Sequence, residues 1–148
     1  MATLKVKIQE DIVLDNQDYG SKRTLEISSI NEVMKRIVTC AASQTTTIAV
    51  FNSNAYGAAG AIDIEDSKYI RITNLDTSNA VELAIVGAAT LYQVNLAAGQ
   101  SHVLGSADGL MLSEADTSPS FGTMADLGSI QVNPGGNAVD AELFIASA

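Results

Sequence analysis

A chain of 148 residues is the size of one ordinary domain and can bury a core without disulfides. Its net charge of −9, with 8 basic residues that cluster at most in pairs, argues against direct binding to nucleic acid, and no apolar run approaches the roughly 20 residues that a membrane-spanning helix needs. Only 17% of the residues are charged, against roughly 25% in typical soluble domains, which favours a surface partly covered by neighbouring subunits over an unusually uncharged monomer.

Residues 4–9 form the first predicted element, a strand with a period of two. Its apolar side chains alternate with lysine and glutamine, an apolar run continues at residues 12–14, and residues 15–21 are dense in turn formers. We therefore expect an N-terminal arm, or first strand and turn, over residues 1–21, followed by a single β-sandwich domain over residues 22–148.

This N-terminal segment has two interpretations. It can add a strand to an adjacent subunit, as extended segments do in β-augmentation, or it can be an ordinary first strand in its own sheet. In the first case its apolar side chains are the candidate assembly contacts, namely Leu4, Val6, Ile8, Ile12 and Leu14.

Residues 23–27 predict the next strand, whereas residues 30–37 are compatible with a short helix. The β-branched side chains across residues 33–41 favour instead a strand, a turn and a second strand at residues 45–51. The one cysteine, Cys40, lies in this apolar stretch and is expected to be a buried thiol. A single unpaired thiol without a secretion signal favours synthesis in a reducing cytosol.

The middle of the chain predicts a β-hairpin. Two alternating strands, 69–73 and 81–85, flank turn-forming residues, so a hairpin is expected from residue 69 to about residue 86, and further strands follow at 91–96 and 101–104. The apolar faces of these strands are expected to be buried, which makes the predicted core Ile70, Ile72, Val81, Leu83, Ile85, Val94 and Leu104.

The last third combines an irregular region with a second predicted hairpin. Residues 105–128 lack a period. At most one or two short helices are expected in the chain, and residues 108–116 and 30–37 are the segments where one would form. Residues 129–133 and 138–146 alternate around the sequence Pro-Gly-Gly-Asn, which is a strong hairpin signal. Strands that recur about every 8–12 residues predict an all-β, antiparallel fold of roughly seven to ten strands, either a sandwich or a barrel.

No sequence pattern of an enzyme is present. His102 is the only histidine, so a multi-histidine metal site is excluded, and it is expected to be an edge or core residue and not a general base. Asp63, Glu65 and Asp66, and separately Asp76, offer the oxygen ligands that Ca²⁺ prefers but lack the spacing of a known Ca²⁺ loop. We therefore expect no catalytic, cofactor or metal site.

Two segments carry a family resemblance. Y-I-R-I-T-N-L-D-T-S-N-A-V-E-L-A-I (residues 69–85) and L-A-A-G-Q-S-H-V-L (residues 96–104) resemble small structural proteins of tailed bacteriophages, particularly those that infect marine bacteria and cyanobacteria. The resemblance extends loosely over residues 25–148 and consists of turn and strand patterns. It implies a virion component with a jelly-roll-like or related β-sandwich.

The expected function is therefore that of a non-enzymatic virion structural protein, foremost a capsid decoration (cement) subunit made in the host bacterial cytoplasm. Its expected partners are itself and the major capsid protein or other virion proteins. The resemblance favours a trimer, because virion β-proteins of this kind often sit at three-fold positions. A tail, connector or fibre-associated subunit is the first alternative. A sandwich module that binds glycans or another ligand is the second, which a content of only 5% aromatic residues disfavours.

Overall fold

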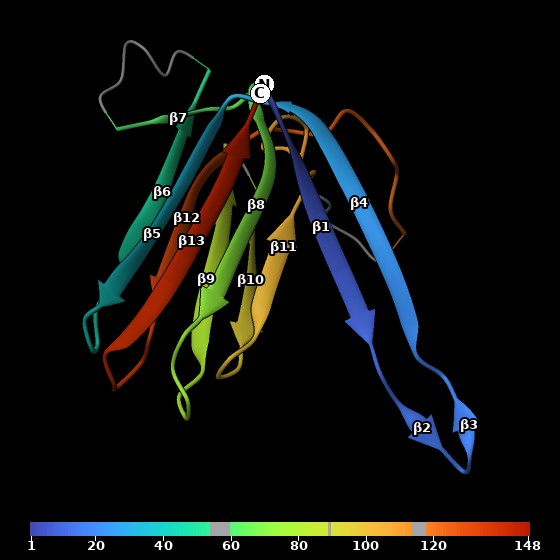
Figure 1. Cartoon of the computed structure of the whole chain (residues 1–148). Coiled ribbons are helices and arrows are strands. Elements are labelled where there is room, and N and C mark those ends of the chain that lie inside the picture. The colour runs from blue at the N-terminus through green and yellow to red at the C-terminus, as the bar shows by residue number, and fades with distance from the viewer. Residues whose placement is uncertain (54–59, 89, 114–117) are drawn as a thin grey trace.

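The computed structural model describes residues 1–53, 60–88, 90–113 and 118–148, and within them the chain is all-β. Two antiparallel sheets pack face to face (Figure 1). The first, called here the arm-side sheet, has the order β11 (Ser101–Leu104), β8 (Ser67–Asn74), β13 (Val139–Ser147) and β5 (Glu32–Cys40). The second, called here the far sheet, has the order β10 (Leu91–Leu96), β9 (Val81–Gly87), β12 (Leu127–Asn133) and β6 (Thr46–Asn52), with β7 (Ile62–Asp63) added in parallel to β6.

This strand order is that of a jelly roll. If the eight main strands are counted along the chain, the arm-side sheet contains the first, eighth, third and sixth, and the far sheet contains the second, seventh, fourth and fifth. Two interleaved Greek keys give this arrangement. The prediction of an all-β, antiparallel, jelly-roll-like sandwich is confirmed.

The core lies between the two sheets and consists of the inward-facing residues of alternating strands. Six of the seven predicted core residues are buried, namely Ile70, Ile72, Val81, Leu83, Ile85 and Leu104. The seventh, Val94, is half-buried because β10 is an edge strand of the far sheet.

Both predicted hairpins are wrong. The strands of the first, β8 and β9, lie in different sheets, and so do β12 and β13, which flank the sequence Pro-Gly-Gly-Asn. The loops that join these strands cross from one sheet to the other. Packed sheets lie roughly 10 Å apart, whereas the paired strands of a hairpin lie roughly 5 Å apart. A hairpin and a crossing between sheets give the same sequence pattern of alternating strands and turn residues, because each strand buries one face in both arrangements.

The described residues contain no helix, and therefore no helix that is long and apolar enough to span a membrane. Residues 32–37 belong to β5, where β-branched side chains suit an extended strand, and residues 108–113 are irregular. The rest of the helix expected at 108–116 lies outside the described residues.

The N-terminal region is a long hairpin outside the sandwich. β1 (Ala2–Glu10) pairs with β4 (Ser21–Ile30), and β2 (Val13–Leu14) pairs with β3 (Gln17–Asp18) at the tip. Asp15 and Asn16 both have a positive φ, 50° and 62°, as a two-residue turn of type I′ requires. The boundary expected at residue 21 is therefore too early, because residues 21–30 pair with β1. We call residues 2–30 the arm.

Candidate assembly surface

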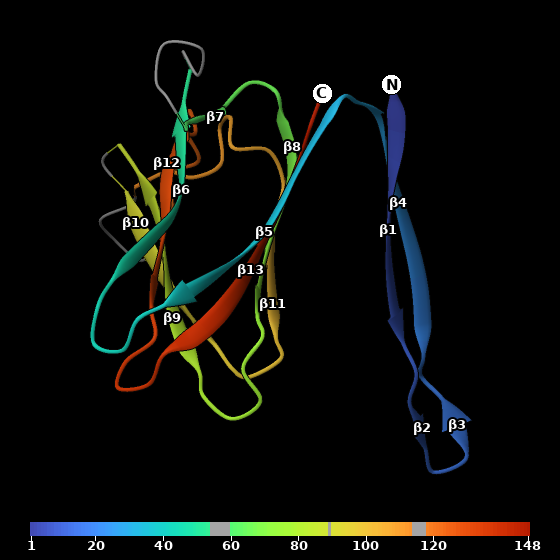
Figure 2. The same ribbon diagram turned by 60° about the vertical axis from the view of Figure 1, so that its left-hand side comes forward.

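The arm is attached to the sandwich at one end. A small cluster forms there from Leu4, Val6 and Ile27 of the arm and from Tyr69 and Phe144 of the arm-side sheet. The rings of Tyr69 and Phe144 meet edge to face, with centroids 6.0 Å apart. The arm then diverges from the sheet towards its tip (Figure 2). Only the attached end is thus held by the chain's own core.

The register of the hairpin gives the arm one apolar face. Directly opposite residues on antiparallel strands project to the same side, and the pairs Leu4–Ile27, Val6–Leu25 and Ile8–Arg23 therefore share a face. Beyond the attached end this face is open to solvent: Ile8 is 57% exposed and Leu25 is 54% exposed. Exposed apolar side chains continue at the tip, with Ile12, Val13, Leu14 and Tyr19. Exposed apolar side chains grouped on one element are a common feature of surfaces that contact other molecules, which makes the arm a candidate assembly surface.

The structure divides the five predicted assembly contacts into two groups. Leu4 and Val6 are half-buried against the chain's own sandwich, whereas Ile8, Ile12 and Leu14 remain exposed. Within the chain β1 pairs with β4 and joins neither sheet of the sandwich. Sequence reasoning missed Leu25, which the alternation of residues 23–27 places on one side of a strand but not opposite β1.

The other face of the arm is polar and basic. Lys5 and Glu26 form an ion pair of 2.8 Å with both side chains more than half exposed, so this pair contributes little stability. Three of the eight basic residues of the chain, Lys5, Lys7 and Lys22, lie on this face, and Glu26 is the one acidic residue beside them in the paired strands. The middle of the arm is therefore positively charged in a chain whose net charge is −9.

The outer face of the far sheet has the opposite character. The strands β6, β9, β10 and β12 contain one charged residue, Glu82. Val50 and Leu91 are about half exposed on this face, at 48% and 55%. A shallow hollow of about 310 Å³ lies on it, lined by residues that include Glu82, Ala84, Leu91 and Gln93. Four strands with a single charge form an unusually neutral outer surface.

The arm-side sheet is more charged and has its own ion pairs. The guanidinium of Arg71 donates a hydrogen bond of 2.6 Å to the Glu142 carboxylate, and Lys35 lies 3.6 Å from the second oxygen. Arg71 also lies over the ring of Phe144, 5.7 Å from its centroid. The hydrogen bond from Arg71 and the charges of both cations lower the pKa of Glu142.

The Glu142 carboxylate makes the free energy of unfolding depend on pH. Because the folded-state pKa of Glu142 lies below its unfolded value, its contribution is present above the unfolded pKa and is lost as the pH falls through the folded pKa. We expect Glu142→Gln to lower the free energy of unfolding by about 1–2 kcal/mol at pH 7, and this difference to vanish on acidification. Urea unfolding at several pH values measures it, with Glu32→Gln on the same sheet as the control. A difference that does not shrink as the pH falls contradicts it.

The acidic residues considered for Ca²⁺ have structural roles in their loops. Asp63 Oδ1 accepts hydrogen bonds from the backbone N–H groups of Glu65 and Asp66, at 3.0 and 3.3 Å. Asp76 Oδ1 accepts bonds from the N–H groups of Ser78 and Asn79, both 2.7 Å, and these lower the pKa of Asp76. Among the described residues no group of three or more metal-ligating side chains occurs.

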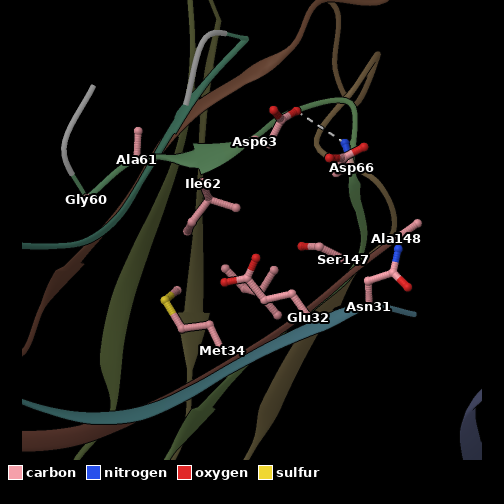
Figure 3. Close-up of a pocket in the computed structure, with 11 residues that line it drawn as sticks. Asn31, Glu32, Met34, Gly60, Ala61, Ile62, Asp63, Asp66, Ser147 and Ala148 are labelled. Atoms are coloured by element: carbon pink, nitrogen blue, oxygen red, sulfur yellow. Dashed lines mark hydrogen bonds between the residues drawn. The ribbon is translucent and has the colours of Figure 1, made fainter. Parts of the chain in front are cut away.

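A hollow lies at the end of the sandwich between β5, β7 and the C-terminal residues (Figure 3). It measures about 450 Å³, and its described lining contains Glu32, Asp63 and Asp66 next to Met34 and Ile62. The described part of this lining holds no aromatic ring. Sugar-binding sites usually present rings to the sugar faces, so this hollow does not favour glycan binding.

His102 and Cys40 are likewise part of the framework. His102 Nε2 lies 3.2 Å from the Tyr92 hydroxyl, and burial lowers the pKa of His102. Cys40 is fully buried, and burial raises the pKa of its thiol, which makes it a poor nucleophile.

Comparisons with known proteins do not assign this chain to a family. A scan against protein-family models found no match, and neither did a search of curated proteins. Among solved structures, the chain is similar to a chain from work described as "Bacillus endospore appendages form a novel family of disulfide-linked pili", with a TM-score of 0.43 and 12% identity, over 81% of this chain and 88% of that one. A likeness this distant says nothing about the activity or partners of the present chain.

Proposed function

We propose that the chain is a non-enzymatic structural subunit of a tailed-bacteriophage virion, foremost a capsid decoration subunit that associates with itself and with the shell. The observation that carries this proposal is the arm, which projects from a complete sandwich and exposes apolar side chains along its length. A protein that worked as a lone monomer would gain nothing from such an element, and the exposed apolar surface would favour aggregation.

Low charge supports the same proposal. Charged residues make up 17% of the chain, and the far sheet presents four strands with one charge. Large neutral surfaces are suited to burial between subunits, where each unpaired charge would carry a desolvation cost. The jelly-roll sandwich is used by many viral shell proteins, although a fold alone does not assign a function. A tail or connector subunit would use the same arm, and the resemblance to phage structural proteins covers both.

The first test asks whether purified virions contain this chain. We expect mass spectrometry of purified virions to detect this chain in stoichiometric amounts, and its gene to lie beside a major capsid or portal gene. A chain that is absent from virions and made only inside the infected cell would contradict the proposal.

A second test measures the contribution of the arm. A variant that lacks residues 2–27 is expected to keep a folded sandwich, because the core between the two sheets contains no arm residue, and to bind itself and the shell at least about tenfold more weakly, a loss of about 1.4 kcal/mol or more. Light scattering and co-sedimentation with capsids measure these affinities, and far-UV circular dichroism serves as the folding control. Unchanged binding by the folded variant would show that the arm is not the contact.

A further inference from the structure

Two surfaces of the described chain are shaped for contact but are not covered by the chain itself. One is the open part of the arm's apolar face, with Ile8, Leu25 and the charged Arg23. The other is the neutral outer face of the far sheet, with its shallow hollow and the single charge of Glu82. Both are extended and expose apolar side chains, but the far-sheet face carries one charge whereas the arm face carries Arg23 and, one pair further along the hairpin, Glu10, which accepts a hydrogen bond from Ser21.

Arg23 on the arm and Glu82 on the far sheet are opposite in charge. Arg23 faces the same side of the hairpin as Ile8, because the two residues are directly paired. Glu82 borders the hollow, where its carboxylate is exposed and accepts only a 3.2 Å hydrogen bond from Asn133. An Arg placed against a carboxylate in an otherwise neutral interface gives orientation and specificity.

The geometry points to contact between copies. The arm stands on one side of the sandwich and the far sheet forms the opposite side (Figure 2). A chain therefore cannot place its arm on its own far sheet. We propose that the arm of one copy docks, by the face that carries Ile8, Arg23 and Leu25, on the outer face of the far sheet of a second copy, with Arg23 next to Glu82.

The proposed contact also restricts the symmetry of the assembly. The two contacting surfaces are different and lie on opposite sides, so two copies cannot exchange arms reciprocally. The contact is heterologous, and copies add head to tail until they close into a ring or continue as a filament. The assembly is thus a cyclic oligomer such as a trimer, or an open polymer, and not a two-fold dimer.

Another exposed apolar surface is a poorer receptor for the arm. The hollow lined by Leu110, Met111, Leu112, Phe121 and Met124 measures about 250 Å³, and its described lining includes no acidic side chain to meet Arg23. The arm-side sheet already pairs Glu142 with Arg71 and Lys35. The far sheet is the described face on which an exposed carboxylate stands alone among neutral side chains.

The first experiment exchanges the two charges. We expect Arg23→Glu and Glu82→Arg each to weaken self-association by about tenfold or more, because each places like charges together, and the double variant to restore it. Lys7→Glu makes the same charge change on the opposite face of the arm and is expected to leave self-association unchanged. Sedimentation velocity over a range of concentrations measures the association.

The second experiment tests the head-to-tail arrangement. Leu25→Asp disables the arm and Leu91→Asp disables the far sheet, and both residues are exposed, so each variant is expected to fold and to remain a monomer. An equal mixture has one intact arm surface and one intact far-sheet surface per pair, so it is expected to form a 1:1 heterodimer and stop there. Thermal melts of both variants serve as the folding control.

The inference rests on the proposed function only in requiring self-association, and the outcomes separate the two. A wild-type oligomer whose mass is unchanged by Arg23→Glu and by Glu82→Arg overturns this contact and leaves self-assembly standing, as does a double variant that does not recover. A wild-type chain that stays monomeric at tens of micromolar overturns the contact, while detection of the chain in virions would still support the proposed function.

Discussion

Replacing Leu83 with alanine is expected to lower the free energy of unfolding by about 2–5 kcal/mol. Leu83 is fully buried on β9, a strand of the far sheet that is paired on both sides. Its direct neighbours are Val94 on β10 and Val132 on β12, and its side chain points into the space between the two sheets. Truncation therefore removes apolar contacts and leaves a cavity that the paired backbone on both sides cannot close.

The matched control is Leu91→Ala on the adjacent strand. Leu91 is 55% exposed on the outer face of the same sheet, so its truncation is expected to cost less than about 1 kcal/mol. Urea unfolding of both variants, followed by circular dichroism, measures the difference in the midpoint at a common slope. Equal losses for the two variants would show that the register of β9 is inverted, since a shift by one residue exchanges the faces of a strand.

The faces of the strands could be predicted from the sequence, but their partners could not. A period of two in residues 69–73 and 81–85 indicates which side chains are buried, and Ile70, Ile72, Leu83 and Ile85 are buried. Which strand lies beside which depends on contacts distant in the sequence. In a jelly roll, consecutive strands often change sheets, and the same turn residues serve a hairpin and a crossing.

The same limit applies to the candidate assembly surface. Ile8, Ile12 and Leu14 were predicted because they are apolar side chains in a segment set apart by turn formers, and they are exposed. Leu25 was not, because its contribution depends on the pairing of β4 with β1. The neutrality of the far sheet could have been noticed as long uncharged stretches, yet only the fold brings β6, β9, β10 and β12 together into one face.

Asn74 shows how a turn residue holds a crossing between the sheets. It is the last residue of β8 and is fully buried. Its side-chain amide donates hydrogen bonds to the carbonyl oxygens of Asn79, at 2.8 Å, and of Leu96, at 3.1 Å. Its side-chain oxygen accepts a bond of 3.0 Å from the N–H group of Asp76. One side chain thus ties the crossing at residues 75–80 to the end of β10 in the opposite sheet.

We therefore expect Asn74→Leu to lower the free energy of unfolding by about 2–4 kcal/mol, because a leucine of similar size leaves buried backbone groups without partners. Asn74→Asp keeps the acceptor but sets a carboxylate against two carbonyl oxygens, so its loss should be largest at neutral pH and should shrink on acidification, when the protonated side chain can donate again. Urea unfolding between pH 3 and pH 7 measures both, with exposed Asn95→Leu on β10 as the control. If Asn74→Leu costs no more than Asn95→Leu, the crossing is held by its backbone alone, through bonds such as that from the N–H group of Leu75 to the Asp140 carbonyl at 2.9 Å.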